Sequence, residues 1–480
     1  MAKILFINPN KWGRGITHIW IASHSGLLKR NKHKVQLFDC SFYEGWSENE
    51  NKFNTNNKQY KKSQYDELIN FTKKNIKNEL QKVINNFKPN IIFWSAISAH
   101  IHGEGEYVNI ENGYNLVNEI DFGKSLLVTG GLQATSMPVE IFNKMKKIDI
   151  LIRGESEKVL LDIADSIDSD KKVYRCKGIA YKNKNEIILN EKQEIFNDLD
   201  FLSPYDYEIF NAQSLLRPYN GEVIKSVDYE MSRGCIYSCA YCVETIIQKY
   251  YGFNEKSNNG AIKNFKSYLR HKSPEKTFEE IKFLHEKLKI KLFRCQDTNF
   301  LTIDRNFLKE LSELIKSSNL DIYLYIETRP EGINPASIEL LKSLKVDGVG
   351  MGVELASEEF REEELNRFAS QKKTIEAFRL LKENNIKRTS YNVIGFPNQT
   401  EESIKATIEF NKLIKPDNIT VAFYSPYHGT EMAEKGYDNN MFDAFQPNVD
   451  SQLRSTSKDS LISVEKLNYY KKNFLDFVYD

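Results

Sequence analysis

The sequence predicts an α/β protein in which two sheets of mostly parallel strands follow one another along the chain. In residues 1–170, and again in residues 227–423, short apolar runs alternate with longer amphipathic segments. Short apolar runs predict strands buried on both faces, and the longer segments predict the helices that cover them. The chain has 480 residues, of which 40% are hydrophobic, so it is long enough for about three domains with sizeable cores.

Residues 1–170 predict a doubly wound, Rossmann-like domain. Helices are expected at Ile16–Lys29 and Tyr65–Phe87, and residues 41–63 lack periodicity and predict an irregular surface insertion. In an open parallel sheet of this kind, a ligand binds at the carboxyl ends of the strands. The five predicted strands are Lys3–Asn8, Lys34–Phe38, Asn90–Trp94, Ser125–Thr129 and Asp149–Ile152.

Residues 171–224 predict a small β connector, and residues 225–432 predict six further βα units. Six units are too few for a closed eight-stranded barrel, so a barrel-like sheet is expected, with functional groups where its strands end. Residues 433–480 predict a C-terminal helical segment, whose aromatic side chains are expected to pack on the barrel. The strands after the one that leads into the cysteine loop are Lys291–Cys295, Asp321–Glu327, Asp347–Glu354, Lys387–Ile394 and Asn418–Phe423.

Composition excludes several classes of protein. The net charge is +1, from 67 Lys and Arg against 66 Asp and Glu, and this balance does not favour a nucleic acid partner. The apolar run at residues 4–7 is too short for a signal peptide, and no run approaches the roughly 18 residues of a membrane span. Six cysteines in a chain of this length do not form a disulfide scaffold, so we expect a cytoplasmic protein.

Three thiols lie within eight residues, at Cys235, Cys239 and Cys242. Structural zinc normally takes four protein ligands, and no fourth cysteine or histidine follows at ligand spacing. The loop suits either an incomplete zinc site or an iron–sulfur cluster with one open iron. The second interpretation makes the protein a candidate enzyme.

The pattern Cys-x-x-x-Cys-x-Tyr-Cys, with Tyr241 before the last cysteine, resembles the signature of the radical S-adenosylmethionine (SAM) superfamily. The resemblance implies a partial (β/α)6 barrel and a [4Fe-4S] cluster held by the three cysteines as catalytic and metal-binding residues. It also implies that SAM chelates the fourth iron, and that an electron from a reductant such as flavodoxin or ferredoxin cleaves it to a 5'-deoxyadenosyl radical.

Other positions resemble the SAM-binding elements of this superfamily, where polar or glycine residues follow a predicted strand. From the residues alone, the polar groups at 297 and 299 are equally suited to capping a turn, and Arg367 is equally suited to neutralising the glutamates at 362–364. His428, in the loop that ends the last barrel strand, is expected to be structural. The SAM-binding residues that the resemblance implies, besides Tyr241, are Asp297, Asn299, Glu354, Arg367, Gly395, Phe396 and Pro397.

The N-terminal region resembles the cobalamin-binding domain that precedes many radical enzymes. The resemblance rests on the segment Gly130–Thr135 with its paired glycines, on Pro138 and on the segment Ile148–Glu157. The Asp-x-His-x-x-Gly loop that supplies a histidine ligand to cobalt in other cobalamin proteins is absent, and His18 is not expected to replace it. The residues implied in cobalamin binding are Asn8, Gly130, Gly131, Gly154 and Glu155.

Together these resemblances imply a cobalamin-dependent radical SAM methyltransferase, acting on an unactivated carbon or phosphorus of a small molecule through methylcobalamin. Two alternatives stay open at this point. One is a non-methylating enzyme with the same cofactors, which performs oxidative cyclisation, ring contraction or hydroxylation. The other is a non-catalytic iron–sulfur sensor or electron carrier. Substrate contacts are expected from residues 244–274, with Tyr250, Tyr251, Arg270 and His271, and from the C-terminal segment.

Overall fold

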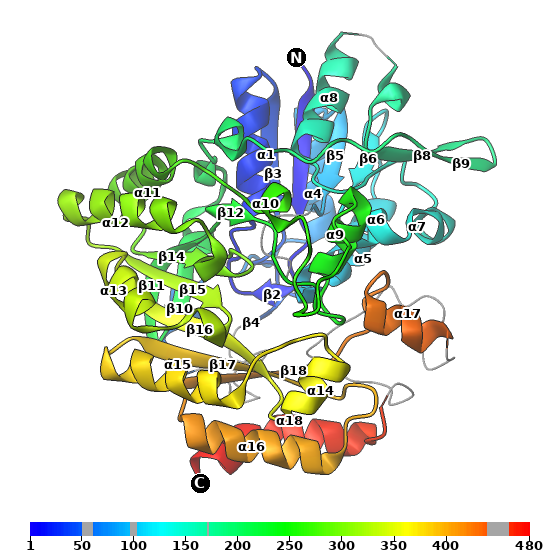
Figure 1. Cartoon of the computed structure of the whole chain (residues 1–480). Helices are drawn as coiled ribbons and strands as arrows, with labels where there is room; N and C mark the ends of the chain where they lie inside the picture. Colours follow the sequence, from blue (N-terminus) through cyan, green and yellow to red (C-terminus); the bar gives the residue numbers. More distant parts are fainter. Residues whose placement is uncertain (50–60, 97–102, 170–171, 439–459) are drawn as a thin grey trace.

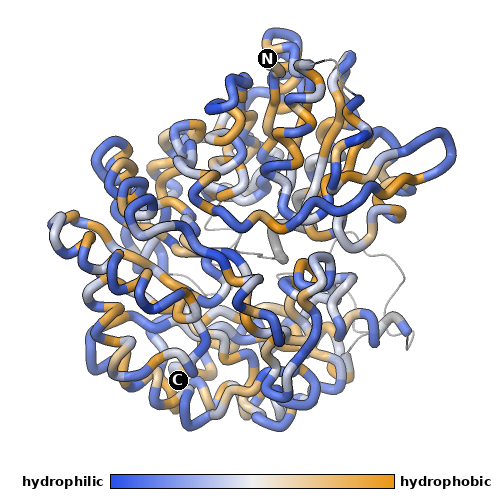
Figure 2. Tube along the Cα trace, turned by 45° about the horizontal axis from the view of Figure 1, so that its top comes forward, coloured by the Kyte–Doolittle hydropathy of each residue, from blue (hydrophilic) through white to orange (hydrophobic). Residues whose placement is uncertain are grey.

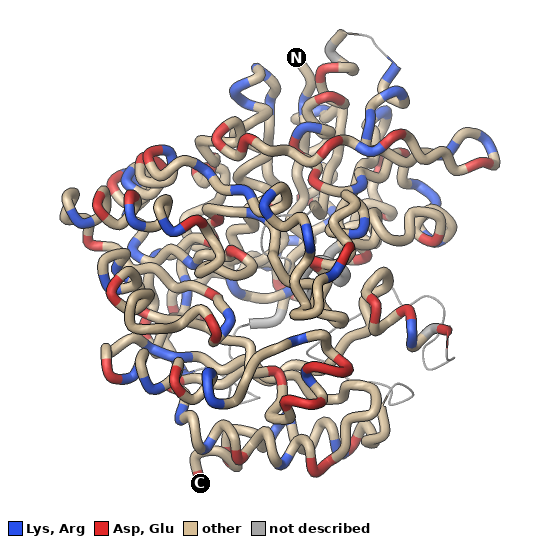
Figure 3. The backbone as a smooth tube through the Cα atoms, in the orientation of Figure 1, with Lys and Arg blue, Asp and Glu red and all other residues tan. Residues whose placement is uncertain are grey.

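The computed structural model describes residues 1–49, 61–96, 103–169, 172–438 and 460–480. It contains two seven-stranded sheets, one in each half of the chain, with helices packed on them (Figure 1). Positive and negative side chains are interspersed over both halves, as the near-zero net charge suggests (Figure 3). None of the described helices is long and apolar enough to cross a membrane.

The N-terminal sheet has the order β3-β1-β5-β6-β7-β8-β9. Its first five strands are parallel, and β8 and β9 continue it as antiparallel strands. The five parallel strands confirm the doubly wound prediction. The strands are β1 (Lys3–Asn8), β3 (Lys34–Asp39), β5 (Ile91–Trp94), β6 (Leu126–Thr129), β7 (Ile150–Ile152), β8 (Ile179–Asn183) and β9 (Glu186–Leu189).

Helices cover both faces of this sheet because successive strand residues point to opposite sides. Ile4 and Phe6 of β1 pack in the core formed with α1 and α8, whereas Leu5 and Ile7 pack in the core formed with α4, α5 and α7. The helices are α1 (Ile19–Arg30), α3 (Tyr65–Leu68), α4 (Ile76–Phe87), α5 (Gly103–Asn118), α6 (Leu132–Ser136), α7 (Pro138–Lys144) and α8 (Glu157–Asp168).

The predicted helix Tyr65–Phe87 is interrupted, and this part of the prediction is wrong. The chain leaves the helical path after Leu68, because the Thr72 backbone hydrogen-bonds to Phe42 and Glu44. The Asn75 side chain then accepts hydrogen bonds from the N–H groups of residues 77 and 78 and caps a new helix, α4. The predicted insertion at residues 41–63 lies partly outside the described residues, and β4 (Glu48–Asn49) pairs with β2 (Trp12–Gly13).

The strands predicted for the connector extend the two large sheets. The hairpin β8–β9 adds to the N-terminal sheet through β7, and β10 pairs antiparallel with β11 at the edge of the second sheet. An independent β layer between the sheets is therefore not seen among the described residues. The domain boundaries at residues 170, 224 and 432 stay a proposal.

The second sheet has the order β10-β11-β14-β15-β16-β17-β18, and its last six strands are parallel. This is the predicted partial barrel. A separate two-stranded sheet pairs β12 (Ser232–Arg233) with β13 (Arg270–His271). The strands are β10 (Leu216–Tyr219), β11 (Glu222–Tyr229), β14 (Leu292–Cys295), β15 (Tyr323–Thr328), β16 (Val346–Glu354), β17 (Lys387–Ile394) and β18 (Asn418–Phe423).

The outer face of the barrel sheet is covered by helices, which alternate between hydrophobic and hydrophilic positions (Figure 2). The C-terminal helix α18 packs on α16 and β18 through Leu467 and Phe474, as its aromatic pattern predicts. The helices are α9 (Glu244–Tyr251), α10 (Phe265–Tyr268), α11 (Pro274–Leu288), α12 (Arg305–Ser318), α13 (Pro335–Ser343), α14 (Glu358–Glu363), α15 (Gln371–Glu383), α16 (Glu401–Ile414), α17 (Glu431–Asp438) and α18 (Val464–Tyr479).

Candidate active site at the carboxyl ends of the two sheets

The cysteine loop runs from β12 to α9, at the carboxyl end of the barrel sheet. The buried Gln248 side chain of α9 donates hydrogen bonds to the carbonyls of Cys235 (3.1 Å) and Tyr237 (2.9 Å). One amide group thus holds the first half of the loop against the helix that follows it. Fixed backbone of this kind keeps ligand side chains in place without help from the ligand.

Two further contacts hold the loop from outside. Gly234 has φ +97°, and a Cβ there would lie 2.6 Å from the Tyr268 carbonyl oxygen, so only glycine fits at the entrance to the loop. The Asn366 side chain donates a hydrogen bond to the Ser238 carbonyl at 2.6 Å. The loop is therefore ordered by residues from α10 and from the segment after β16.

The three thiols sit in a low-dielectric environment. Burial raises the pKa of Cys235 to about 12 and raises the pKa of Cys242 well above its usual range. Thiols placed in this way become thiolates when a nearby cation compensates their charge. Arg329 supplies part of that charge, because its Nη1 lies 3.9 Å from Cys239 Sγ and its guanidinium stacks 3.7 Å from the Tyr237 ring centre.

The donor set suits a cluster. Within the described ranges, no group of three or more His, Cys, Asp or Glu side chains is close enough together to hold a single metal ion. An iron–sulfur cluster takes its thiolates at separate iron atoms, and soft sulfur donors are the ligands that such clusters use. The three cysteines of this loop are the residues that would hold it.

Asp297 and Asn299 hold backbone at the carboxyl ends of the first three barrel strands. Asp297 is fully buried, and its Oδ1 accepts hydrogen bonds from the N–H groups of Met231 (3.0 Å) and Ser232 (2.6 Å). Burial raises the pKa of Asp297 to about 6, although these hydrogen bonds oppose the shift. Asn299 Oδ1 accepts from the Arg329 N–H at 3.2 Å. Both side chains thus position the segments that carry the cluster ligands and Arg329.

Glu354 and Arg367 form a buried pair beside the cysteine loop. Arg367 Nη2 lies 3.7 Å from Glu354 Oε1 and donates a 2.6 Å hydrogen bond to the Gly352 carbonyl. Arg367 is 5% exposed, so it does not neutralise the surface glutamates that follow β16. A Cβ at residue 352 would lie 2.2 Å from Glu354 Oε1, which explains the glycine. The pair can offer one charge of each sign to the amino-acid end of SAM.

The loop after β17 presents a buried aromatic ring next to the cysteine loop. Gly395 has φ +82°, and its N–H donates to the Gln399 side chain at 2.7 Å, which closes the turn. Phe396 is fully buried, and its ring centre lies 5.7 Å from that of Tyr241 and 5.2 Å from that of Tyr424. The predicted SAM residues Tyr241, Phe396 and Pro397 therefore belong to one group of neighbouring segments.

The predicted cobalamin residues lie at the carboxyl end of the N-terminal sheet, but their neighbours differ. Asn8 is buried and its Nδ2 donates to Asp39, whereas its Oδ1 has no partner among the described residues. A Cβ at Gly130 would meet only ordinary or slightly tight contacts, while a Cβ at Gly154 (φ +75°) would lie 2.5 Å from the Tyr251 hydroxyl. Gly154 thus makes room for tyrosines of the barrel half.

Gly131 and Glu155 also differ in their neighbours: Gly131 serves the N-terminal half, whereas Glu155 contacts the barrel half. Gly131 has φ +97° and begins α6, so it serves a tight βα turn. Glu155 is engaged by Arg270, whose Nη1 and Nη2 donate at 3.0 and 2.7 Å. Arg270, Tyr250 and Tyr251 were predicted to contact substrate, and the structure places all three against the loop at 153–155.

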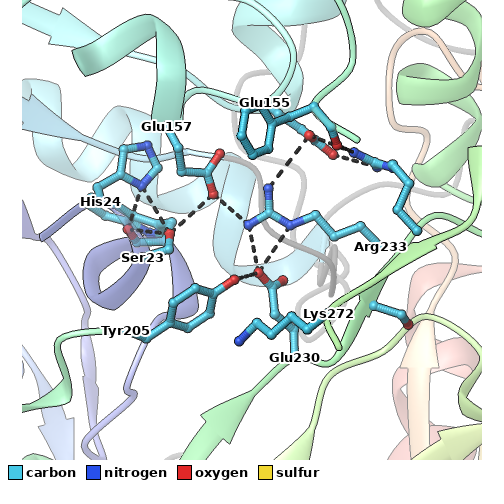
Figure 4. A network of polar contacts seen from close by, with 12 residues as sticks. Ser23, His24, Glu155, Glu157, Tyr205, Glu230, Arg233 and Lys272 are labelled. Atoms are coloured by element: carbon cyan, nitrogen blue, oxygen red, sulfur yellow. Dashed lines mark hydrogen bonds and ion pairs between the residues drawn. The ribbon is translucent and has the colours of Figure 1, made fainter. Parts of the chain in front are cut away.

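A buried ionic network joins the N-terminal half to the entrance of the cysteine loop (Figure 4). At its centre is Arg233, two residues before Cys235, with 2% of its side chain exposed. Arg233 Nη2 lies 2.6 Å from Glu157 Oε1 of the N-terminal half and 2.6 Å from Glu230 Oε1 of the barrel half. Its Nη1 lies 3.7 Å from Glu155.

The network continues on both sides of Arg233. Ser23 donates to Glu157 at 3.2 Å, and Tyr205 donates to Glu230 at 2.5 Å. Burial by itself raises the pKa of Glu157, but the attraction and hydrogen bonding of Arg233, together with the attraction of His24, outweigh it and lower the pKa to about 2. Glu157 is therefore ionised at neutral pH, and the two halves are joined by charge-assisted hydrogen bonds in a water-poor interface.

Two histidines were weighed as candidates. His18 is half-buried, and the partial loss of water around its ring lowers its pKa to about 4, so the ring is neutral at pH 7. It lies beside Asp228 of β11, whose carboxylate accepts from the Thr17 hydroxyl at 3.1 Å. His428 is half-buried in the loop after β18, and a catalytic role for it stays untested.

Sequence reasoning did not identify Arg233, Glu157 and Arg329 as site residues. Glu157 and Arg233 are 76 residues apart and lie in different halves of the chain, so no local pattern pairs them. The available signal was their position, because Arg233 borders the cysteine motif and Glu157 ends the segment Arg153–Glu157. Arg329 follows a strand directly, which is where a barrel places functional side chains.

Comparisons with known proteins agree with this geometry. Residues 229–410 match the family model described as the Radical SAM superfamily. These residues form a radical SAM domain, and the protein is a radical SAM enzyme. The family implies a [4Fe-4S] cluster and SAM as cofactors.

Solved structures extend the likeness to the whole fold. The radical SAM methyltransferase TsrM from Kitasatospora setae superposes with a TM-score of 0.67 and 15% identity, over 92% of this chain and 76% of that one. The cobalamin-dependent SAM radical enzyme OxsB, with aqua-cobalamin and SAM bound, gives a TM-score of 0.56 and 15% identity, over 86% of this chain and 52% of that one. At this identity the likeness shows a shared fold.

Sequence relatives include proteins named for different reactions. An uncharacterized methyltransferase of Pyrococcus horikoshii is 23% identical over 76% of this chain and 72% of its own length. An anaerobic magnesium-protoporphyrin IX monomethyl ester cyclase of Rubrivivax gelatinosus is 23% identical over 99% of this chain and 79% of its own length. The specific reaction therefore differs among proteins similar to this chain.

Proposed function

We propose that this protein is a cobalamin-dependent radical SAM methyltransferase, which transfers a methyl group from SAM to an unactivated carbon, or to a phosphorus, of a small molecule. One observation carries the proposal: Arg233 fixes the entrance of the cysteine loop to Glu157, at the carboxyl end of the N-terminal sheet. This contact brings the two candidate cofactor regions to one boundary. When bound, the cluster and SAM supply a 5'-deoxyadenosyl radical, and cobalamin carries the methyl group.

The roles of this chain's residues follow from their positions. Cys235, Cys239 and Cys242 would hold the cluster, with Arg329 donating toward the thiolate of Cys239. Glu354 and Arg367 would orient the amino-acid end of SAM, and the turn at residues 395–397 would pass beside its adenine.

Within the N-terminal half, Asn8 and the glycines at 130–131 remain available to cobalamin, because the βα turn and the Asn8 Oδ1, which has no partner among the described residues, lie at the strand ends. Gly154 and Glu155 are occupied by the barrel half, and we assign them to the interface. The residues that we propose to bind cobalamin are therefore fewer than those that the sequence implied. A reductant such as flavodoxin or ferredoxin, and a cytoplasmic location, stay predictions.

Anaerobic turnover with SAM that carries a deuterated methyl group tests the proposal. A methyltransferase yields 5'-deoxyadenosine, S-adenosylhomocysteine and a product that carries the label. The variant Cys239→Ser is the matched control and should yield none of the three.

The cyclase relatives favour a second candidate, a reaction with the same cofactors and no methyl transfer. In that case 5'-deoxyadenosine forms and the product carries no label. A protein that holds its cluster but never cleaves SAM is a sensor or electron carrier, and this outcome would reject both candidates.

A further inference from the structure

A layer of polar side chains on the inner face of the barrel has no role in the assignments above. Asp228 of β11 pairs in register with Arg294 of β14, and Arg294 pairs with Tyr325 of β15. Glu327 lies two residues further along β15, on the same face, and Tyr391 reaches it from β17. These five residues form one continuous layer, which we call the inner layer.

The inner layer is accessible, unlike the outer face of the same strands. Arg294, Glu327 and Tyr391 are each half-buried, whereas the residues immediately before and after each of them are buried. The inward side chains of a closed barrel normally pack into a solid core. Here they leave charged and phenolic groups within reach of a small molecule.

The glycines of β16 create the space for this layer. A Cβ at Gly350 would lie 2.4 Å from the Tyr391 hydroxyl, and a Cβ at Gly348 would lie 2.8 Å from the Tyr325 ring. The two phenols cross the glycine strand and meet, with 2.8 Å between their oxygens. Tyr391 then donates to Glu327 Oε1 at 3.0 Å, which fixes the carboxylate.

Nearby Asp228 and Glu327 stabilise the charge of Arg294 and raise its pKa in spite of burial, but its N–H donors remain unused within the described ranges. The Asp228 carboxylate already pairs with Arg217, and it accepts from Gln296 at 3.0 Å and from the Thr17 hydroxyl at 3.1 Å. Arg294 Nη1 lies 3.7 Å from the same carboxylate, and its guanidinium makes no hydrogen bond to the described part of the chain. Five N–H donors in a planar fork suit a carboxylate that arrives with a ligand.

The inner layer lies directly below the cluster loop. Glu327 and Arg329 are two residues apart on one strand, which is roughly 6.6 Å, and Arg329 contacts Cys239 Sγ. At its other edge the layer meets the N-terminal half, because Thr17 bonds to Asp228. A molecule on this layer therefore lies between the two candidate cofactor regions.

We propose that the inner layer binds the substrate, and that the substrate is a small zwitterion whose carboxylate pairs with Arg294 and whose ammonium group pairs with Glu327. An α-amino acid is the simplest molecule of this kind. A carboxylate has about four lone-pair sites, so the hydrogen bond from Tyr391 does not prevent Glu327 from accepting an ammonium group. The two charges fix both ends of the ligand, so the side chain of the zwitterion points to the cluster. This inference rests on the proposed function for what the bound molecule undergoes.

Ligand-detected saturation-transfer NMR on the anaerobically reconstituted full chain, saturated with SAM, tests the inference. The probe is a pool of the twenty proteinogenic L-amino acids, compared with pools of the corresponding amines and carboxylic acids. At least one amino acid should bind, and its amine and acid counterparts should bind more weakly. Arg294→Gln and Glu327→Gln should each weaken that binding at least tenfold, whereas Lys291→Gln, at an exposed position just before the same strand, should not.

Two results would overturn the inference: no amino acid of the pool binds the wild-type chain, or binding is the same in Arg294→Gln. Cleavage of SAM to 5'-deoxyadenosine is measured on the same samples without added amino acid. Intact cleavage with failed binding rejects only the zwitterion, whereas binding without cleavage rejects the proposed function. Cluster content and SAM binding should be unchanged in both variants, and this separates loss of the ligand contact from loss of the fold.

Discussion

The two sheets end at the same boundary, yet their side chains do different things there. At the end of the N-terminal sheet, Glu155 and Glu157 are paired with arginines of the barrel half. At the end of the barrel sheet, three thiols and a polar layer face inward. Asp228 of this layer pairs with Arg217, whereas Arg294, Glu327 and Tyr391 stay half-buried. One sheet end serves mainly to hold the two halves together, and the other keeps reactive groups accessible. Substitutions in the two regions should therefore fail in different ways.

The largest effect is expected from the cysteines. Cys239→Ser should remove the cluster and lower SAM cleavage by at least about 10³-fold, equivalent to roughly 4 kcal/mol of activation free energy. Iron and sulfide content, the visible absorbance of the cluster and 5'-deoxyadenosine formation measure it. Cys176→Ser, at a half-buried cysteine outside the loop, should keep all three. Equal loss in both variants would contradict the assignment of the cluster to this loop.

Substitutions in the ionic network at the end of the N-terminal sheet should lower the stability of the folded chain. Arg233→Met leaves three buried carboxylates without their shared cation, and the loss of one partner of a buried ion pair costs about 3 kcal/mol or more. A lower unfolding midpoint and faster proteolysis between the two halves would show it. Asp162→Asn removes a surface pair on α8 and should change stability by less than about 1 kcal/mol.

A functional readout sharpens this prediction. If Arg233 positions the cysteine loop, Glu157→Gln should keep the cluster but alter its reduction potential or its EPR signal. A purely structural contact would lower the unfolding midpoint and leave the spectroscopy unchanged. The conservative variant Arg233→Lys should restore part of the stability, but not the two simultaneous contacts of the guanidinium.

The elements of the fold that sequence patterns predict well are those with buried strands and regular helices. Bounds of β1, β17 and β18 agree with prediction, because apolar runs are local features. The break between α3 and α4 was missed, because Thr72 leaves the helix to bond with residues 42 and 44, which is a tertiary contact. Periodicity within one segment contains no information about such a partner.

Prediction of the candidate site has the same limit: a local pattern does not reveal contacts between distant segments. The three cysteines could be predicted because their spacing is local, whereas the pairing of Arg233 with Glu157 joins distant segments. Glu155 was predicted to bind cobalamin, yet Arg270 occupies its carboxylate. The accessibility of Arg294 could not be predicted either, because it depends on two glycines of β16 that leave space for phenols of β15 and β17.

A pH dependence of stability is expected from Asp297. Its pKa is about 6 in the folded chain and near 3.8 in the unfolded chain, so between these values the folded state holds a proton that the unfolded state has lost. Stability must then fall as pH rises from about 4 to about 6. In Asp297→Asn this fall should be absent, because the amide oxygen can accept the same hydrogen bonds from residues 231 and 232 without ionising.

Unfolding midpoints of the apo chain between pH 4 and 7.5 measure the effect. The difference between wild type and Asp297→Asn should grow in favour of the variant as pH rises. Asp162→Asn, on the surface of α8, should follow the wild-type curve. If the two unfolding midpoints differ by the same amount at all pH values, Asp297 does not titrate in this range. Groups other than its present hydrogen-bond partners would then stabilise its buried carboxylate.

The smallest effect is expected from His18, and it bears on how the N-terminal sheet end would hold cobalamin. The ring is neutral and half-buried beside Asp228, and no described residue hydrogen-bonds to its Nε2. Its contact with the barrel half makes it part of the interface that distinguishes this sheet end from the other. His18→Gln should therefore leave the absorbance spectrum of bound cobalamin unchanged and lower the unfolding midpoint only slightly. A shift of that spectrum would identify His18 as a cobalt ligand and would remove the contrast between the two sheet ends.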